Sequence, residues 1–485
     1  MNLADYCTQD ALGLADLAAT GEVTAAELAA CAAAACDLVN PALNAVRELY
    51  ADAISAPEVT PGGPFTGVPF LLKDLSASQK DRVCESGSQM LVGHVAKADS
   101  EIVRRMKASG LNLMGRTAAP EFGWSASTES RLSGITRNPW NPDRSAGGSS
   151  GGAAAAVAAG IVPMAHASDG SGSIRNPAAW CGLVGLKPSR GRISAAPGPG
   201  MPPGGRPVQF VVSRTLRDSA AALDAWAGAM PGDPFAIPAT GMPCLSAIGR
   251  PPGPLRIAFS IEAPSGGTVE PDVQDAVMDV ARALAEMGHH VEDAAPRYDW
   301  DALVDAILVT AAAGIAARID GIARESGQSP SVENLHLTTW ETYRFGKTIP
   351  ATDLVAAMAH LDAVSRASGP FFATHDLLLT PSSTRTAPPH GTHDADRGGL
   401  RPRDWSDIIH REDCFLLLAN VTGQPAISLP LAESAAGMPI GVHLEAAFGR
   451  EDLLFQVAGQ LDRAMPWAGR KPAVHATSSA QGAAT

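Results

Sequence analysis

Residues 147–177 are the most informative stretch of this chain and read GGSSGGAAAAVAAGIVPMAHASDGSGSIRNP. Two loops of glycine and serine, Gly147 to Gly152 and Asp169 to Arg175, flank an alanine-rich segment that contains Pro163. The run from Ala153 to Ala165 is mostly alanine and glycine and is too short to span a membrane. It therefore predicts a buried helix that leads into a strand.

The same alternation of elements continues on the N-terminal side of this stretch. The short apolar run Gly67 to Leu72 is bounded by glycine and proline and predicts a buried strand that ends at Lys73. Residues 100–109 then predict a helix closed by Gly110, and residues 111–115 predict a strand. Helices and strands that alternate in this way indicate an α/β chain.

The remaining segments define the expected organisation. Thr24 to Glu27 form a capping box that predicts a helix through Leu38, within an N-terminal helical lead-in over residues 1–60. A catalytic domain is expected over residues 61–473, with a Pro/Gly-rich insertion at about 231–254 and a disordered tail over 474–485. Further predicted elements are strands at 255–259 and 377–379, helices at 271–287 and 451–463, and helices that continue to about Ala367.

Charge and composition exclude several classes of protein. The chain has 37 Lys+Arg against 50 Asp+Glu, which gives a net charge of −13. Because this charge repels phosphate groups, a nucleic-acid or membrane partner is not expected. Neutral or cationic substrates should approach the protein more readily than anionic ones. The first basic residue is Arg47, which does not fit a secretory signal peptide. Seven cysteines at irregular spacing predict free thiols and a cytoplasmic location.

The glycine-rich loops alone allow several interpretations. A phosphate-binding loop would need a lysine near its end, where Ala153 stands. Gly147, Ser149 and Gly151 match a nucleophile elbow, but the preceding residues 138–144 are not the apolar strand that this turn requires. Taken separately, each loop is typical of a flexible connection. No Cys-x-x-Cys, His-Glu-x-x-His or Gly-x-Gly-x-x-Gly pattern is present, and Cys181 is more typical of a buried inert thiol than of a nucleophile.

Taken together, the motifs resemble the amidase signature family of serine hydrolases. The resemblance rests on Lys73-Asp74, on the two Gly/Ser loops and on Cys181 to Pro188. The serines at 149 and 173 in the two loops lie 24 residues apart, which is the interval of the family. The resemblance continues at Thr422 to Ala426 and Gly437 to Gly441. Within the family, the segments at residues 137–141, 189–194 and 449–454 most resemble the 6-aminohexanoate cyclic dimer hydrolases. The family implies one α/β/α fold, a mixed β-sheet flanked by helices on both faces.

The resemblance also implies a catalytic site without cofactor or metal. Ser173 would be the nucleophile, Ser149 a bridging serine on a cis peptide bond, and Lys73 the base. The backbone N–H groups of Gly170, Ser171, Gly172 and Ser173 would form the oxyanion hole, and Asp169 and Arg175 would support this loop. A lysine, whose ordinary pKa is ~10.4, can act as a base near neutral pH only where burial lowers that value. Lys73, one of only seven lysines, follows a predicted buried strand and fits that need.

Two departures from the family pattern bear on the substrate. The family usually has Gly-Gly-Ser at the nucleophile, and this chain has Ser171-Gly172-Ser173. The helix predicted at 302–317 lacks the pocket cysteine of the cyclic dimer hydrolases and is rich in alanine, which indicates a larger acyl pocket. We expect an amidase that acts on a small-molecule linear or cyclic amide. The alternatives are a carbamate or ester hydrolase and a subunit of the glutamine-amidotransferase A type; a homodimer is expected from the family.

Overall fold

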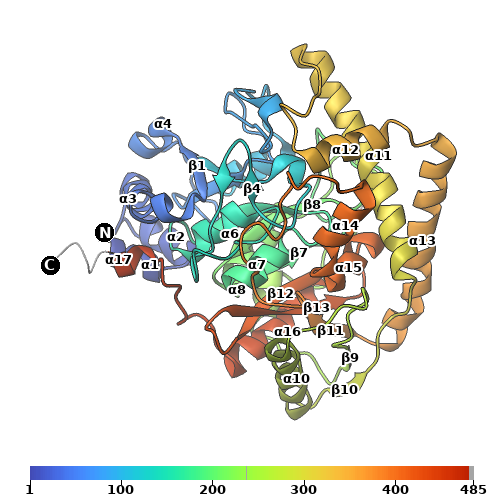
Figure 1. The fold of residues 1–485 in the computed structure, drawn as a ribbon. Helices are drawn as coiled ribbons and strands as arrows, with labels where there is room; N and C mark the ends of the chain where they lie inside the picture. The colour runs from blue at the N-terminus through green and yellow to red at the C-terminus, as the bar shows by residue number, and fades with distance from the viewer. Residues whose placement is uncertain (236, 480–485) are drawn as a thin grey trace.

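The computed structural model describes residues 1–235 and 237–479 (Figure 1). Its α-helices are α1 Leu3–Thr8, α2 Ala11–Ala19, α3 Ala25–Leu43, α4 Ala51–Ser55, α5 Glu101–Ala108, α6 Gly151–Ala158, α7 Arg175–Cys181, α8 Leu216–Trp226, α9 Cys244–Ala247, α10 Pro271–Glu286, α11 Trp300–Ser326, α12 Leu337–Gly346, α13 Ala351–Thr374, α14 Pro402–Arg411, α15 Leu417–Thr422, α16 Glu451–Ala464 and α17 Ala476–Ser479. The 3-10 helices are η1 Gln89–Leu91, η2 Glu121–Gly123 and η3 Cys414–Leu416.

The strands are β1 Val46–Leu49, β2 Pro69–Lys73, β3 Asn112–Thr117, β4 Glu129–Ser130, β5 Gly134–Ile135, β6 Met164–Asp169, β7 Val184–Lys187, β8 Val208–Ser213, β9 Arg256–Phe259, β10 His290–Asp293, β11 Leu377–Pro381, β12 Ala426–Glu433 and β13 Pro439–Ala446. All except β4 and β5 join one 11-stranded sheet in the order β1-β3-β2-β6-β8-β7-β12-β13-β11-β9-β10. β2 is parallel to β3 and β6, and β9 to β10 and β11, whereas the other pairs are antiparallel. The predicted mixed sheet in an α/β fold is confirmed.

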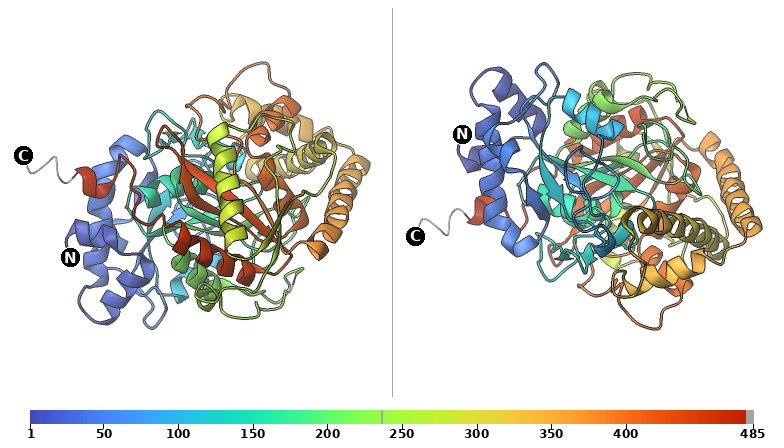
Figure 2. Two further views of the ribbon diagram at one scale, coloured as in Figure 1. Left: turned by 90° about the horizontal axis from the view of Figure 1, so that it is seen from below. Right: turned by 90° about the horizontal axis from the view of Figure 1, so that it is seen from above.

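Helices cover both faces of this sheet (Figure 2). Gly441 and His443 of β13 face α7. A Cβ atom at Gly441 would meet Ala179 at 2.4 Å, and His443 Nε2 lies 3.1 Å from Arg175 Nη1. Successive strand side chains point to opposite faces, so Val442 and Leu444 face the other way. On that other face α10 and α16 pack against β12 and β13.

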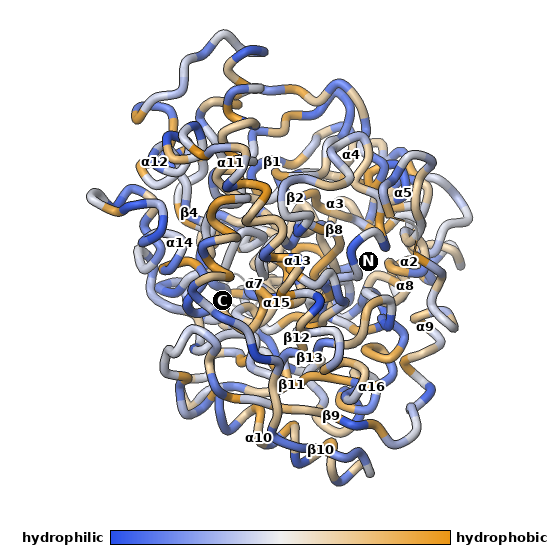
Figure 3. The backbone as a smooth tube through the Cα atoms, turned by 90° about the vertical axis from the view of Figure 1, so that its right-hand side faces the viewer, coloured by the Kyte–Doolittle hydropathy of each residue, from blue (hydrophilic) through white to orange (hydrophobic). Residues whose placement is uncertain are grey.

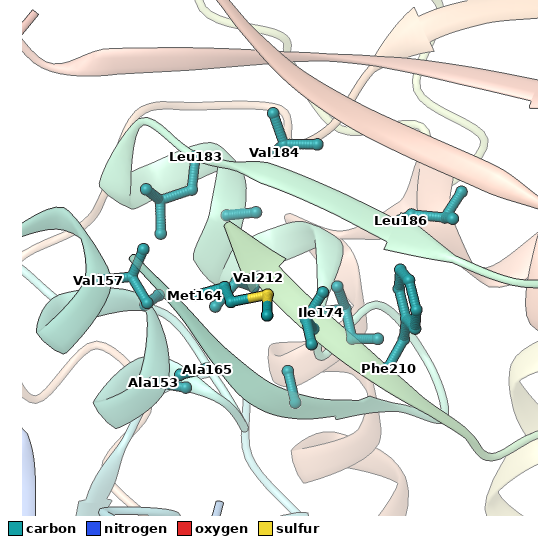
Figure 4. Close-up of a cluster of buried hydrophobic side chains, with 14 of the residues drawn as sticks. Ala153, Val157, Met164, Ala165, Ile174, Leu183, Val184, Leu186, Phe210 and Val212 are labelled. Atoms are coloured by element: carbon teal, nitrogen blue, oxygen red, sulfur yellow. The ribbon is translucent and has the colours of Figure 1, made fainter. Parts of the chain in front are cut away.

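Part of the hydrophobic core surrounds Ile174, in the second Gly/Ser loop, and the helix α6 that follows the first loop. Figure 4 shows Ile174, at the start of α7, packed with Phe210 and Val212 of β8 and Leu186 of β7. The alanine-rich helix α6 is buried along its whole length, which is possible because its small side chains let it lie close to β6 and β8. Hydrophobic residues concentrate along these inner elements and hydrophilic ones along the outer loops (Figure 3). The loops therefore start from rigid, buried elements.

A second group of helices, α11 to α15, packs beside the sheet at the end opposite the N-terminal helices (Figures 1 and 2). Leu303, Ile307 and Leu361 join α11 to α13 in a separate apolar cluster. α11 and α3 are long and apolar enough to span a membrane by composition, but about half of each is buried inside the fold. Core helices of soluble proteins pass the same test, so this is weak evidence for a membrane span.

The two ends of the chain correct parts of the sequence analysis. The lead-in is helical as predicted, with the Thr24 capping box in place, but it also contributes β1, which pairs antiparallel with β3. The tail is not disordered from residue 474: Ala476 is buried, its N–H donates to Ala159 O, and α17 packs against α1 and α3. Residues 480–485 lie outside the described residues.

Candidate active site

The topology of the sheet brings the predicted residues to one edge. β2 and β6 are parallel neighbours, so their carboxyl ends lie side by side. Lys73 is the last residue of β2, and Asp169 is the last residue of β6 and begins the second Gly/Ser loop. The first loop ends at Ser150 and continues into α6, which packs against both strands. The two loops and Lys73 therefore meet at this edge.

Lys73 lies at the centre of a cluster of serines. Its Nζ is 2.8 Å from Ser149 Oγ, 2.8 Å from Ser150 Oγ and 3.0 Å from Ser168 Oγ. The side chain is fully buried, and within the described part of the chain no carboxylate lies within 4.0 Å of Nζ. Burial lowers the pKa of Lys73 to about 7, against a smaller opposing effect of the negative charge on Asp169. A large fraction of this amine is therefore neutral near pH 7.

The first Gly/Ser loop holds Ser149 in a fixed place. The peptide bond between Gly148 and Ser149 is cis, as the resemblance implied. Gly147 has a φ of +80°, and a Cβ atom there would meet Pro177 Cα at 2.6 Å, so both its conformation and its packing require glycine. The Gly148 N–H donates to Asn176 Oδ1 at 3.1 Å. The loop is thus tied to α7, which follows the second loop.

Asp169 and Arg175 join the two ends of the second loop. Arg175 Nε donates to Asp169 Oδ2 at 3.0 Å, and both side chains are fully buried. Burial alone would raise the pKa of Asp169, but the Arg175 guanidinium holds it well below its usual range. Asp169 also accepts hydrogen bonds from the N–H groups of Gly172, at 2.7 Å, and Ile174, at 3.1 Å. The carboxylate therefore organises the whole turn around Ser173.

These contacts reduce the number of backbone N–H groups that are free to form the predicted oxyanion hole. The Gly172 N–H is used by Asp169 and is not free to bind an oxyanion. Gly172 has a φ of +119°, a backbone conformation that favours glycine. The N–H groups of Gly170, Ser171 and Ser173 donate to no residue within the described parts of the chain. These three groups are the remaining candidate donors.

A single cavity of about 900 Å³ opens above the serines and Lys73. Ser149, Ser168 and Ser173 line its base, together with Gly170 and Ser171. One wall comes from α11, with Thr310, Ala311, Gly314, Ile315 and Arg318, and another from the loop before β8, with Arg190, Pro202, Pro203 and Arg206. Ala311 and Gly314 leave room on the α11 side, in line with the alanine-rich helix noted in the sequence.

Cys181 and three tryptophans near the site have structural contacts. Cys181 is fully buried, its thiol donates to Ala146 O, and burial raises its pKa, so the thiol is held in its unreactive form. The indole N–H groups of Trp140 and Trp180 donate to backbone oxygens of Cys181 and Arg385. Trp124 lines the cavity but also donates to Thr342 Oγ1.

Three residues at the site were not identified from the sequence. Ser150 and Ser168 both contact Lys73 Nζ, and Arg206 lines the cavity. The sequence did contain a signal for Ser168, because His166 and Ser168 alternate with Ala165 and Ala167 along β6 and so share one face of the sheet. No sequence pattern indicated Arg206, since it lies in an irregular loop between Gly205 and Pro207.

Comparison with known proteins identifies the family of this chain. The family model named Amidase matches residues 23–455. The 6-aminohexanoate-cyclic-dimer hydrolase of Paenarthrobacter ureafaciens is 39% identical over 96% of each chain. A solved structure of 6-aminohexanoate cyclic dimer hydrolase covers 96% of this chain and 99% of its own, with a TM-score of 0.91 and 37% identity.

More distant relatives share the same fold. A bacterial aryl acylamidase of the amidase signature enzymes has a TM-score of 0.84 and 26% identity, and the alignment covers 95% of this chain and 99% of that structure. The match runs through both Gly/Ser loops and the strand that carries Lys73. The chain therefore belongs to the amidase signature family and is a hydrolase of carbon–nitrogen bonds other than peptide bonds.

Proposed function

We propose that Ser173, Ser149 and Lys73 hydrolyse a carboxamide through an acyl-enzyme. Ser173 Oγ attacks the carbonyl carbon and passes its proton to Ser149 Oγ, while Ser149 passes its own proton to neutral Lys73 Nζ. The tetrahedral intermediate then expels the amine, which takes a proton back along the same path. Water repeats these steps on the ester and releases the acid. The observation that carries this proposal is the buried Lys73 Nζ at 2.8 Å from Ser149 Oγ.

The lysine is suited to this role because it can change its charge near neutral pH. A general base works best when its pKa lies close to the pH of the reaction, and burial brings the pKa of Lys73 to about 7. The developing oxyanion would be bound by the N–H groups of Gly170, Ser171 and Ser173, and each such donor is worth roughly 2.7–4 kcal/mol in comparable sites. The Asp169–Arg175 pair would keep those donors in place.

The substrate class follows from the cavity and the relatives. Two relatives are named for the 6-aminohexanoate cyclic dimer, so we propose a linear or cyclic amide of similar size. A cavity of about 900 Å³ has the volume for such a molecule. Carbamates and esters are the alternative, because the same serine chemistry acts on any carbonyl with a departing amine or alcohol. An ammonia-channelling subunit is less well supported, since that likeness is at 24% identity.

Two further expectations concern the protein as a whole. We propose a cytoplasmic location, which the seven unpaired cysteines favour, and a homodimer, which only the family resemblance favours. Light scattering of the purified protein would measure the oligomeric state.

A kinetic panel tests the proposed function. Purified protein should hydrolyse an amide without any partner chain, and the panel compares it with a carbamate that has the same leaving amine and an ester that has the same acyl group. Ser173→Ala should lose turnover of all three substrates. Wild-type turnover by the Ser173→Ala protein would refute the proposal, and a requirement for added subunits would favour the amidotransferase alternative.

A further inference from the structure

Arg206 differs from the other buried arginines of this protein. Four arginine side chains are buried in the described residues: Arg116, Arg175, Arg192 and Arg206. The first three form ion pairs, with Glu85, Asp169 and Glu451 respectively. Arg206 is 7% exposed and has no carboxylate within 4.0 Å among the residues that the structure describes. A buried charge without a partner is costly, so its presence needs an explanation.

The contacts of Arg206 leave one edge of its guanidinium group unused. Nη1 donates to Ser171 Oγ at 2.7 Å and to Gly170 O at 3.1 Å, and Ser171 Oγ donates to Gly170 O at 2.7 Å. Nε is buried and has no acceptor, and Nη2 donates to no described residue. Nε and Nη2 form the edge with which arginine binds both oxygens of a carboxylate. Arg206 also lines the cavity above Ser173.

The surroundings of Arg206 add to the positive charge of the cavity. Arg190 and Arg318 also line it, and neither has a carboxylate within 4.0 Å in the described chain. Arg190 instead donates to the backbone oxygens of Asn420 and Val421, and Arg318 to Ser86 Oγ. This local charge is opposite in sign to the net charge of −13 on the whole chain.

The acidic groups that line the same cavity form no ion pair with Arg190, Arg206 or Arg318 among the described residues. Asp169 is paired with Arg175, and Asp233 accepts the Met230 N–H. Burial raises the pKa of Asp413 well above its usual range, against an opposing hydrogen bond from Asn176, which favours its uncharged form. Burial lowers the pKa of His410 to about 3, so this ring is neutral at pH 7. The cavity thus presents arginines to an anionic ligand.

We propose that Arg206 binds a carboxylate of the substrate, so that the preferred substrates are amides of molecules that carry a second, free carboxylate. Half-amides of dicarboxylic acids and N-acylated amino acids belong to this class. The inference rests on the proposed function and narrows its substrate. Ser171, which stands where the family usually has glycine, holds Arg206 Nη1 and so directs the free edge.

Two matched pairs of substrates test this specificity. In the first, hexanedioic acid mono-4-nitroanilide is compared with its terminal carboxamide analogue, so that the carboxylate is on the acyl side. In the second, N-hexanoyl-4-aminobenzoate is compared with N-hexanoyl-4-aminobenzamide, so that the carboxylate is on the amine side of the scissile amide. The wild-type enzyme should prefer the carboxylate member in one pair by roughly 10- to 100-fold in kcat/KM, as expected for a charge-assisted hydrogen bond.

The variant Arg206→Gln should abolish that preference, and Arg206→Lys should retain part of it. Arg282→Gln, on the exposed surface of α10, is the matched control and should keep the wild-type ratio. An equal fall of kcat/KM for both members of each pair would show that Arg206 only supports the nucleophile loop and would overturn the inference. So would a wild-type enzyme without preference in either pair, a result that does not depend on the folding of any variant.

A binding measurement separates this inference from the proposed function. Calorimetry of the Ser173→Ala protein, which should not turn over the diamide, should show tighter binding of hexanedioate than of hexanediamide, by about 10-fold or more, and adding Arg206→Gln should remove the difference. If none of the four amides is hydrolysed but hexanedioate still binds in this way, the proposed function fails and the inference stands. If the amides are hydrolysed but hexanedioate binds no better than the diamide, the inference fails alone.

Discussion

At the scale of single residues, the proposed mechanism depends on the charge of Lys73. Burial lowers its pKa to about 7, so the amine is protonated and inactive as a base below that pH and neutral above it. The kcat/KM for a neutral amide should therefore rise as the pH rises through about 7 and then level off. Stopped-flow or steady-state kinetics between pH 5 and 9 would measure this profile.

The variant Lys73→Ala provides the comparison for this profile. It should lose roughly 100-fold or more in kcat/KM, the usual contribution of a general base, while circular dichroism shows an intact fold. A Lys73→Ala enzyme that kept the wild-type rate and the rise near pH 7 would contradict the assignment of Lys73 as the base.

Arg175 pairs with Asp169 across the second Gly/Ser loop, and both side chains are fully buried. Replacement by alanine leaves the charge of Asp169 buried without its cation, and breaking a buried pair in this way typically costs about 3–5 kcal/mol. Urea unfolding of Arg175→Ala should show a loss of that size. Arg282→Ala, which breaks an exposed pair with Asp279, should change the midpoint little, and an equally stable Arg175→Ala protein would refute the account of the loop.

At the scale of elements, the first Gly/Ser loop requires glycine at position 147. A side chain there would have to adopt a φ of +80° and would approach Pro177 Cα to 2.6 Å. Gly147→Ala should therefore lower the free energy of unfolding by about 1–3 kcal/mol and reduce activity with it. Gly253→Ala, at a position with open space, is the control. Thermal unfolding that is the same for both variants would contradict this reading.

The sequence predicted elements best where local patterns and burial agree. The capping box at Thr24, Pro271 at the start of α10 and the apolar run before Lys73 all correspond to observed elements. The predicted ends of two helices came too early. α3 was expected to end at Leu38 but continues through Pro41 to Leu43. The helices before β11 were expected to end at about Ala367, but α13 continues through Pro370 to Thr374. Each of these prolines removes one helical hydrogen bond, and packing, as of the buried Leu43, outweighs the loss.

The candidate site was predictable in its residues but not in its surroundings. Lys73, Ser149 and Ser173 belong to motifs in family order, which a sequence contains directly. Arg206 and the α11 wall reach the cavity from irregular or distant segments, and only tertiary packing brings them there. β1 was missed for a similar reason, because its four residues form a strand only through pairing with β3.

At the scale of the whole molecule, all seven cysteines are unpaired, and six of them are buried. Dithiothreitol should therefore leave the melting temperature unchanged, because no disulfide constrains the unfolded chain. Thiol titration in denaturant, without reductant, should find seven thiols per chain and fewer in the native protein. A lower melting temperature in dithiothreitol would show a disulfide that this structure does not contain.

The central claim is that the acyl group of the substrate passes onto Ser173. Acid quenching of the enzyme during turnover of a slow aryl amide, followed by peptide mapping with mass spectrometry, identifies the acylated residue directly. The acyl mass should lie on the peptide that contains Ser173, should be absent from Ser173→Ala, and should form faster above pH 7 than below it. An acyl group on Ser149, Ser171 or Cys181, or none on the wild-type enzyme during turnover, would contradict the account.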